Sequence, residues 1–236
     1  MTSQPEMDVT RNQLLSKLPG EELERLRPHF EVVSLAHGDH VIVPDVPIRD
    51  VHFPLNCLLS LVTLMSDGAC VESGVVGREG MSGIPVILNA GQTTMPTFTQ
   101  IPGEAIRIKA EIFKAEYERS APLHTLMNRY MHTVVVVGSQ STACNALHQV
   151  EPRFCRWLLM SADGIGSEDV NITHEFLAVM LGVRRATVSE IAGKFQQEGI
   201  IIYKRGRLQI LARERLEQAA CECYRKTREE YERLFA

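Results

Sequence analysis

The sequence NITHEFLAVMLGVRRATVSEIAGKFQQEG at residues 171–199 predicts two helices joined by a tight turn. Thr173 can cap a first helix whose apolar residues recur at helical spacing, and Gly182 permits a left-handed turn after it. Val183 then fills the angle between the two helices. The second helix begins after Arg184. Its predicted buried side chains are Val188, Ile191, Ala192 and Phe195. This pattern is typical of a helix-turn-helix.

The other face of the second helix carries guanidinium, hydroxyl and carboxylate groups that suit the base edges and phosphates of double-stranded DNA. These candidate DNA-binding residues are Arg184, Arg185, Thr187, Ser189, Glu190 and Lys194. The segment IIIYKRGRLQIL at residues 200–211 predicts two short strands around a basic turn. Lys204, Arg205 and Arg207 of this turn form a wing that can contact phosphate. A plain helical hairpin with a solvated polar face is the alternative interpretation.

The net charge of −4 conceals an uneven distribution of charge. Residues 171–216 contain eight Lys and Arg against four Asp and Glu, which gives +4. The remaining 17 basic and 25 acidic residues give −8. A small DNA-reading module attached to a larger body that does not bind DNA would show this asymmetry, because phosphate contacts need cations only on the reading face.

Composition predicts a globular chain: 44% of the 236 residues are hydrophobic, enough to build a sizeable core. The N-terminus MTSQPEMDVTRNQ lacks a basic start and an apolar segment, and no run of about 18 apolar residues occurs. We therefore expect a soluble, cytoplasmic protein with no membrane partner. The six cysteines are scattered and include no CxxC pair, so free thiols are expected.

The N-terminal half predicts a helical lead-in followed by a β body. Residues 10–28 read as two short helices split by Pro19-Gly20. From Phe30 to about Ile108, short β-branched runs alternate with turn residues. These runs are EVVSLA, HGDHVIVP, DVHFPL, LLSLVTL, CVESGVV, PVILN, TMPTFTQI and EAIRI. Their spacing of about 8 to 12 residues favours an antiparallel roll, barrel or sandwich. The fold class is therefore α+β.

After Pro122, turn signals almost vanish, which predicts a helix of about 25 residues and close to 40 Å. Its apolar stripe is Leu123, Leu126, Met127, Tyr130, Met131, Val134, Val137, Gly138, Ser141, Ala143, Cys144, Ala146 and Leu147. The helix could be a buried partner of the β body or could pack against its copy in a second subunit. The dimer is favoured, because small residues allow close approach and the β body alone could not cover so long a stripe.

A new helix starts near Pro152 and opens the last part of the chain. We expect a sensory β-roll with its helical lead-in at residues 1–120 and a dimerisation helix at 121–148. A winged helix-turn-helix domain with a C-terminal helix is expected at 149–236.

Three stretches resemble the Crp/Fnr family of bacterial transcription regulators, and the resemblance extends over nearly the whole chain. They are LLSKLPGEELERLRPHFEVVSLAHGDHVIVPD (14–45), HQVEPRFCRWLL (148–159) and ITHEFLAVMLGVRRATVSEIAGKFQQEGII (172–201). The resemblance implies a cyclic-nucleotide-binding-type β-roll, a central dimerisation helix and a C-terminal winged helix-turn-helix. It also implies a homodimeric regulator, not an enzyme, with DNA and RNA polymerase as partners and an unidentified signal sensed in the roll.

By motif position, Arg185 matches the family's arginine at the start of the recognition helix, and Thr187 matches a hydroxyl residue that contacts phosphate. Ala186 stands where many members have a glutamate that reads cytosine, and Glu190 stands where arginine is common. The operator is therefore expected to differ from the family's usual half-site.

Nucleotide-binding members carry Gly-Glu and then Arg-Ser to hold a cyclic phosphate. Glu79 and Gly80 could align with the first pair, but Thr94–Thr97 occupy the place of the second, so cyclic AMP is not expected. Arg78 could substitute from the other side. The candidate effector pocket is Arg78, Glu79, Gly80, Thr97 and Thr99, with no cofactor expected. A nucleotide-responsive or haem-responsive member of the family is the alternative.

No metal site and no catalytic residues are expected. No cysteine precedes Cys57, so the N-terminal iron–sulfur pattern is absent, and Cys221 and Cys223 should point to opposite faces of a helix. Haem binding is left open, because several side chains of the roll could ligate its iron. These are His29, His37, His40, His52, Cys57 and Cys70. A thiol enzyme built from His132, Cys144, His148 and Cys155 would lack an orienting group. A pure interaction module would not need Arg184, Arg185 and the basic wing.

Overall fold

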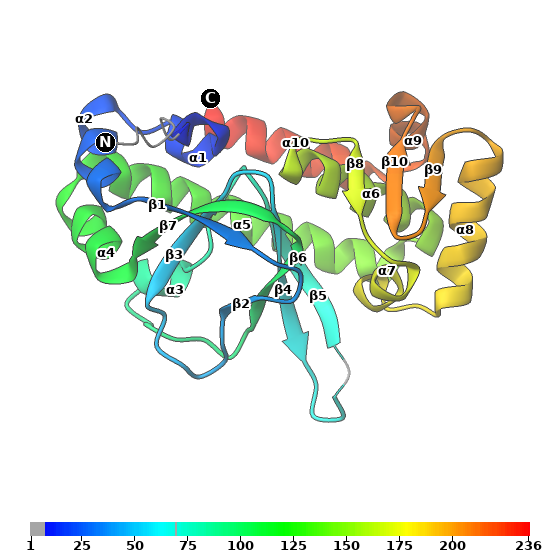
Figure 1. Ribbon diagram of the computed structural model, residues 1–236, viewed down its shortest axis with the longest axis horizontal. Coiled ribbons are helices and arrows are strands. Elements are labelled where there is room, and N and C mark those ends of the chain that lie inside the picture. The colour runs from blue at the N-terminus through cyan, green and yellow to red at the C-terminus, as the bar shows by residue number, and fades with distance from the viewer. Residues whose placement is uncertain (1–7, 69) are drawn as a thin grey trace, which may run out of the picture.

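The computed structural model describes residues 8–68 and 70–236 of the chain. The N-terminal body and the C-terminal domain lie side by side, and one long helix runs beneath both (Figure 1). The lead-in consists of short helices, as the Pro19-Gly20 break predicts. They are η1 (Val9–Arg11), α1 (Gln13–Ser16), α2 (Gly20–Leu26) and η2 (Arg27–His29). The Asn12 side chain caps α1 by accepting from Leu15 N at 3.0 Å.

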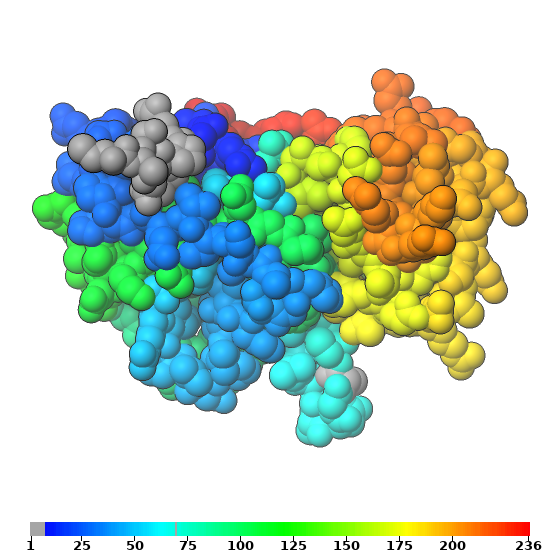
Figure 2. All heavy atoms as spheres, viewed as in Figure 1, coloured from blue at the N-terminus to red at the C-terminus, as the bar shows by residue number. Residues whose placement is uncertain are grey.

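The N-terminal body is an antiparallel β-roll, which confirms the predicted α+β fold. Its strands are β1 (Glu31–Leu35), β2 (His40–Ile42), β3 (Asp50–Pro54), β4 (Leu58–Leu64), β5 (Cys70–Val76), β6 (Thr97–Ile101) and β7 (Gly103–Lys109). They form two sheets with the orders β1-β7-β3 and β2-β6-β4-β5. Glu31 pairs with Arg107 in the first sheet, and in the second the register shifts opposite Leu61 and Val62, where Ser73 is an extra residue in β5. The β4–β5 hairpin projects from the body (Figures 1 and 2).

One predicted strand is wrong: PVILN contains a short helix, α3 (Ile84–Ile87), instead. Gly83 has a φ of +89°, which turns the chain, and Pro85 lies in the first turn of α3. Proline has its φ preset for a first helical turn and has no N–H to donate to a sheet, so its position favours a helix over a central strand.

The helix α4 (Ala110–Arg119) precedes the long helix α5 (Ala121–Leu147), which has 27 residues. Ser120 caps α5, and Pro122 lies in its first turn. The N-terminal part of the predicted apolar stripe is buried in the chain's own core. These residues are Leu123, Leu126, Met127 and Tyr130, packed with Phe53 and Phe113. The expectation that the β body could not cover the stripe is therefore wrong for this part of the helix.

The helix α10 (Glu222–Phe235) covers a further side of α5, which the sequence analysis did not anticipate. The two helices are antiparallel: Arg129 Nη2 donates to Arg233 O at 2.6 Å, and Gln140 Nε2 donates to Cys223 Sγ at 3.0 Å. Leu234, near the end of α10, is buried in the core of the N-terminal body. The C-terminal helix thus runs back from the last domain to the roll (Figure 1).

The C-terminal domain has one core between four helices and a three-stranded sheet. Its elements are α6 (Val150–Ile165), β8 (Asp169–Asn171), α7 (His174–Leu181), α8 (Arg185–Gln197), β9 (Ile201–Lys204), β10 (Arg207–Ile210) and α9 (Arg213–Ala219). Phe154, Trp157, Leu177, Val188 and Phe195 are buried together in its core. The sheet order β8-β10-β9 confirms the predicted hairpin and adds β8. Within the described residues, no helix has the length and apolarity needed to span a membrane.

The roll and the C-terminal domain pack closely. A Cβ added to Gly77 would lie 2.3 Å from Gly164 Cα, so the segment after β5 can approach the α6 backbone this closely only because Gly77 has no side chain. Arg78 N donates to Gly164 O at 2.8 Å in the same place. Trp157 of α6 donates its indole N–H to Glu72 of β5 at 2.8 Å. These contacts join the roll to the domain that carries the helix-turn-helix.

Candidate nucleic-acid interface and interdomain cleft

The turn between α7 and α8 has the geometry that the sequence predicts. Thr173 caps α7 by accepting from Phe176 N at 3.2 Å. Gly182 ends the helix with a φ of +66°, a conformation that L residues with a Cβ rarely adopt. Val183 N then donates to Ala178 O at 2.9 Å, and the Val183 side chain packs against the core of the domain. The two helices are therefore held at a fixed angle.

The helix α8 is amphipathic, with one buried face and one exposed face. Val188, Ile191, Ala192 and Phe195 are buried, as predicted. Arg184, Arg185, Glu190 and Lys194 are exposed, and Thr187 and Ser189 are half-buried. Helical phase also places Ala186, Gly193 and Gln197 on the outward face. Gln197 was missed by the sequence analysis, although its spacing of seven residues from Glu190 could have identified it.

Three of the predicted DNA-binding residues also contact their own domain. Arg185 Nη1 lies 2.8 Å from Glu175 Oε1, and both side chains are more than half exposed, so this pair contributes little to stability. Ser189 Oγ is hydrogen-bonded to His174 Nδ1 at 2.9 Å, so it fixes α8 against α7. Lys194 Nζ lies 2.6 Å from Glu151 Oε1 of α6. Among the three, Arg185 has the most exposed side chain, and a phosphate or base could replace its carboxylate partner.

The side chains of His174 and Tyr203 support the exposed surface of α8 and the wing. The sequence did not reveal this contact. Their rings stack with centroids 4.0 Å apart, which links the start of α7 to β9. Burial, with the nearby Arg185 cation, lowers the pKa of His174. Tyr203 N donates to Gln196 Oε1 at 2.8 Å, so the wing is also fastened to α8.

The wing turn has positive φ angles at Arg205 (+51°) and Gly206 (+78°), as a two-residue hairpin turn of the primed type requires. Lys204, Arg205 and Arg207 are all exposed around this turn. Ile172 N donates to Gly206 O at 2.8 Å, which holds the turn beside the start of α7. Two basic elements, the start of α8 and the wing, are therefore presented by one rigid domain.

Arg213, at the start of α9, joins four elements of the C-terminal region. Its guanidinium pairs with Asp163 of α6, with Glu168 at 2.7 Å and with Glu217 at 3.0 Å, and donates to Tyr224 Oη of α10 at 2.7 Å. Burial lowers the pKa of Arg213, but these carboxylates raise it by more, to well above its ordinary value. The sequence analysis counted Arg213 only as a basic residue, although its partners give it a structural role.

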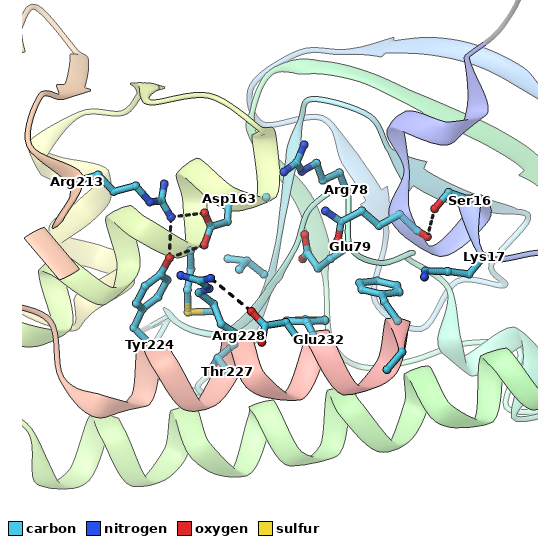
Figure 3. Close-up of a pocket in the computed structure, with 17 residues that line it drawn as sticks. Ser16, Lys17, Arg78, Glu79, Asp163, Arg213, Tyr224, Thr227, Arg228 and Glu232 are labelled. Atoms are coloured by element: carbon cyan, nitrogen blue, oxygen red, sulfur yellow. Dashed lines mark hydrogen bonds and ion pairs between the residues drawn. The ribbon is translucent and has the colours of Figure 1, made fainter.

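A cleft of about 660 Å³ lies between the roll and the C-terminal region. It is lined by α1, by the segment after β5, by α6 and by α10 (Figure 3). Its charged lining residues are Lys17, Arg78, Glu79, Asp163, Arg213, Arg228 and Glu232. Among the described residues, Arg78 forms no ion pair, and its buried Nε has no hydrogen-bond partner. The cleft thus contains a guanidinium that has no ion-pair partner within 4 Å among the described residues.

The structure does not bring the five predicted effector residues into one pocket. Arg78 and Glu79 line the cleft. Gly80 lies against Tyr130, whose Oη would be 2.4 Å from an added Cβ, so a side chain here would displace the tyrosine. Thr97 and Thr99 are buried in β6 and are not among the residues that line the cleft. The Glu79 carboxylate accepts from Gly77 N at 2.8 Å.

Three of the histidines and cysteines of the roll are hydrogen-bonded to the backbone or enclosed by the core. His37 Nδ1 is hydrogen-bonded to Gln100 O at 2.9 Å. Burial lowers the pKa of His52 to about 4 and raises the pKa of Cys57 to about 12, as expected for side chains enclosed by the core. Cys155 is likewise buried, with a pKa raised to about 12, so it is a poor nucleophile.

The expectation that Cys221 and Cys223 diverge is wrong. Their thiols lie with Cys144 and His148 in one group whose potential ligand atoms are all within 4.8 Å of one another. Cys221 precedes α10 with extended backbone angles (φ −70°, ψ 159°), so the helical phase assumed between the two cysteines does not apply. In the described parts of the chain, this is the only group of three or more His, Cys, Asp or Glu side chains arranged to share an ion.

Comparisons with known proteins agree on the fold. Residues 152–219 match the family model described as the Crp-like helix-turn-helix domain. A putative Crp/Fnr-family transcriptional regulator from Eubacterium rectale is 20% identical, with a TM-score of 0.65 over 89% of this chain and 98% of that one. FixK2 from Bradyrhizobium japonicum is 13% identical, with a TM-score of 0.65 over 81% of this chain and 98% of that one.

The global regulator CLP of Xanthomonas campestris, described as responsive to cyclic di-GMP, is 15% identical. Its TM-score is 0.62 over 81% of this chain and 99% of that one. Comparison with curated protein sequences finds no significant match. At these identities, the solved structures establish the fold, and the family model establishes the type of the C-terminal domain.

Proposed function

We propose that this chain, a Crp/Fnr-type regulator with a Crp-like helix-turn-helix domain, is a homodimer that binds a specific DNA operator in response to a signal. The Crp-like helix-turn-helix model over residues 152–219 and the fold shared with solved Crp/Fnr regulators support a DNA-binding regulator rather than an enzyme.

The proposal that the chain binds DNA rests on the amphipathic helix α8 and the basic wing beside it. The buried face holds the helix to its domain, while Arg184, Arg185 and Glu190 face outward. A helix fits the major groove, guanidinium groups recognise guanine or phosphate, and a carboxylate accepts from cytosine. The wing cations then have a phosphate backbone within reach. Ala186 and Glu190 make the usual half-site of the family unsuitable, so the operator must be found by experiment.

Dimerisation is supported by the part of α5 that the chain itself leaves uncovered. We define the exposed stripe of α5 as Val135, Val136, Ala143, Ala146 and Leu147. Val135 is 67% exposed and Leu147 is 79% exposed. Nothing lies within 4 Å of a Cβ added to Gly138, so a second helix has room to approach there. Packing two such stripes would place two α8 helices on one DNA face, about 34 Å apart in successive major grooves. RNA polymerase is a further expected partner.

For the signal, we favour a small anionic ligand in the interdomain cleft. The cleft is shared by the roll and the C-terminal region, so a bound ligand would contact both, and the unpaired Arg78 supplies a cation. Cyclic AMP is not expected, because Thr94–Thr97 occupy the place of the Arg-Ser pair and supply no guanidinium. Calorimetry with cyclic AMP and with cyclic di-GMP, the ligand named for the Xanthomonas regulator, tests this. A micromolar dissociation constant for cyclic AMP contradicts it.

DNA binding is tested with operator fragments selected from genomic DNA by the purified full-length protein. Arg185→Ala is expected to weaken binding of the selected operator by about 1 to 3 kcal/mol, measured by gel-shift titration at fixed salt. Glu175→Gln is the matched control, because it removes the partner of Arg185 and leaves the guanidinium in place. It should bind at least as tightly as the parent protein. Equal affinities for the parent and Arg185→Ala would refute the assignment of α8.

A further inference from the structure

The last turn of α5 and the junction of α9 with α10 bring four potential metal ligands together. They are Cys144, His148, Cys221 and Cys223. Their ligand atoms all lie within 4.8 Å of one another. Cys144 and Cys223 are fully buried, and Cys221 is 8% exposed. The side chain of His148 is 26% exposed. We call this group the Cys3His cluster.

The separations within the Cys3His cluster match those of a single tetrahedral ion. Cys144 Sγ lies 3.5 Å from Cys221 Sγ, and Cys223 Sγ lies 3.5 Å from His148 Nδ1. Zn–S bonds of about 2.3 Å and Zn–N bonds of about 2.05 Å, at tetrahedral angles, require S–S separations of about 3.8 Å and S–N separations of about 3.5 Å. These two separations are within a few tenths of an ångström of the required values, and the others are at most 4.8 Å, so the ligand atoms need to move by up to about 1 Å to accept an ion. Cysteines that bind different irons of a cluster would stand further apart.

The backbone explains how a Cys-x-Cys sequence can chelate. Cys221 precedes α10 with extended angles, while Cys223 lies in its first turn. On α5, Cys144 lies one turn before His148, which ends the helix with extended angles (φ −99°, ψ 146°). Cys144 and His148 are four residues apart, so they lie on one face at the end of α5, whereas Cys221 and Cys223 converge because Cys221 lies outside the helix.

The surroundings of the cluster hold two of its members in the orientation that a metal needs. His148 Nδ1 faces Cys223, while its Nε2 lies 3.3 Å from Glu222 Oε2. A histidine that donates its second N–H to a carboxylate while its other nitrogen is free is the usual arrangement around protein-bound zinc. Gln140 Nε2 donates to Cys223 Sγ at 3.0 Å, a bond that favours a thiolate. The buried Arg156 guanidinium lies near enough to act electrostatically on Cys144 and Cys221.

Ordinary packing does not explain the cluster. Buried cysteines that serve as small apolar residues join the hydrophobic core around them. Here Cys144, Cys221 and Cys223 form a cluster that contains no other buried hydrophobic residue and is separate from both large cores. A disulfide between Cys144 and Cys221 would use only two of the four groups and would require the sulfurs to close from 3.5 Å to about 2.05 Å.

We infer that Cys144, His148, Cys221 and Cys223 bind one Zn²⁺ ion as a closed structural site. Three thiolates and a neutral imidazole fill the four positions of tetrahedral zinc, so no position remains for water or substrate. Binding releases the protons of the thiols to solvent. The ion joins the end of the dimerisation helix to the start of α10 and thereby fastens α5 to the C-terminal region. This inference does not depend on the proposed function.

The test uses the full chain, expressed with zinc in the medium and purified under reducing, oxygen-free conditions. Elemental analysis is expected to find about one zinc per chain. Replacing zinc with Co²⁺ should produce thiolate-to-metal charge-transfer bands and the intense visible bands of tetrahedral cobalt. Cys144→Ser, Cys223→Ser and His148→Gln should lower the zinc content at least tenfold under competition with a chelator. The controls Cys70→Ser and Cys155→Ala remove thiols outside the cluster and should keep the full content.

Thiol reactivity of the unaltered protein tests the inference even if a variant does not fold. Three thiols should be slow to react with a thiol reagent in the zinc-loaded chain and become reactive after the zinc is stripped by chelator. Four outcomes would overturn the inference. They are less than about one tenth of a zinc per chain with no cobalt spectrum, iron with acid-labile sulfide, a Cys144–Cys221 disulfide in the fresh protein, and loss of metal from both control variants.

Discussion

The N-terminal half of α5 is held by hydrocarbon and aromatic side chains, whereas its C-terminal half ends among thiols, an imidazole and charged groups. Leu123, Met127 and Tyr130 are buried in the core of the roll. Tyr130 Oη donates to Met81 O at 3.1 Å and accepts from Met81 N at 3.0 Å, so even its polar atom is satisfied inside. Beyond Thr133, apolar side chains of the helix turn toward solvent, and Cys144 and His148 make the closing contacts.

This difference indicates which end of α5 can respond to conditions in solution. Hydrophobic burial changes little with pH, metal supply or redox state. Thiols respond to pH, metal supply and redox state, a histidine responds to pH and metal supply, and a buried carboxylate responds to pH. The N-terminal half should therefore stay attached to the roll, while the attachment of the C-terminal half to the DNA-reading domain can be loosened or tightened. Three experiments test this contrast.

The largest effect is expected from Met127→Ala in the N-terminal half. Met127 is 1% exposed, so its truncation leaves a cavity in the core and should lower the free energy of unfolding by about 2 to 5 kcal/mol, measured by urea denaturation. Thr125→Ala, on the exposed side of the same turn, should change it by less than about 0.5 kcal/mol. Equal effects of the two changes would mean that burial does not anchor this half.

A smaller effect, confined to association, is expected from Val135→Glu in the C-terminal half. A carboxylate in the exposed stripe of α5 would have to be desolvated in a dimer, so the dimer should dissociate at least about tenfold more readily, or by about 1.4 kcal/mol. Light scattering across a dilution series measures this. Val46→Glu introduces the same charge at an exposed valine of the roll and should leave the dimer intact. A parent protein that is monomeric at micromolar concentration would refute the dimer itself.

The smallest effect concerns pH and Glu72, which bonds Trp157 of α6 beside the C-terminal half of α5. Burial raises the pKa of Glu72 to about 7, although Ser60, Gln100 and Trp157 donate to its carboxylate and the Arg156 cation lies nearby. The native chain therefore holds a proton that the unfolded chain releases above about pH 4.5. Native stability from this residue is accordingly lost as pH rises from about 5 to 8.

Glu72→Gln removes this titration, so thermal melts should show a pH-dependent difference from the parent. The melting temperature of the variant relative to the parent should rise between pH 5 and pH 8 by on the order of 3 °C. Ser73→Ala, on the neighbouring residue, keeps the carboxylate and should follow the parent at every pH. A constant difference between the parent and Glu72→Gln would show that Glu72 stays ionised throughout.

Most elements were predictable because their signals are local. The cap at Thr173, the left-handed Gly182 and the period of Val188 and Ile191 specify the helix-turn-helix within one short segment. Turn residues between β-branched runs likewise indicate the roll. The prediction failed at α3, where Val86 and Ile87 suggested a strand but Pro85 and Gly83 started a helix. Residue type alone did not reveal that Ser189 bonds His174, since that contact depends on how α7 and α8 are packed.

By itself, the amino-acid sequence predicted the helix-turn-helix and which face of α8 is exposed, because periodicity, caps and turn residues act over a few neighbouring positions. Only the tertiary structure decided where the groups with special chemistry meet. Cys144 and Cys221 are 77 residues apart and come together only because α10 folds back along α5. The interdomain cleft likewise needs α1, α6 and α10 at once. Such sites are made by packing, and no local pattern records them.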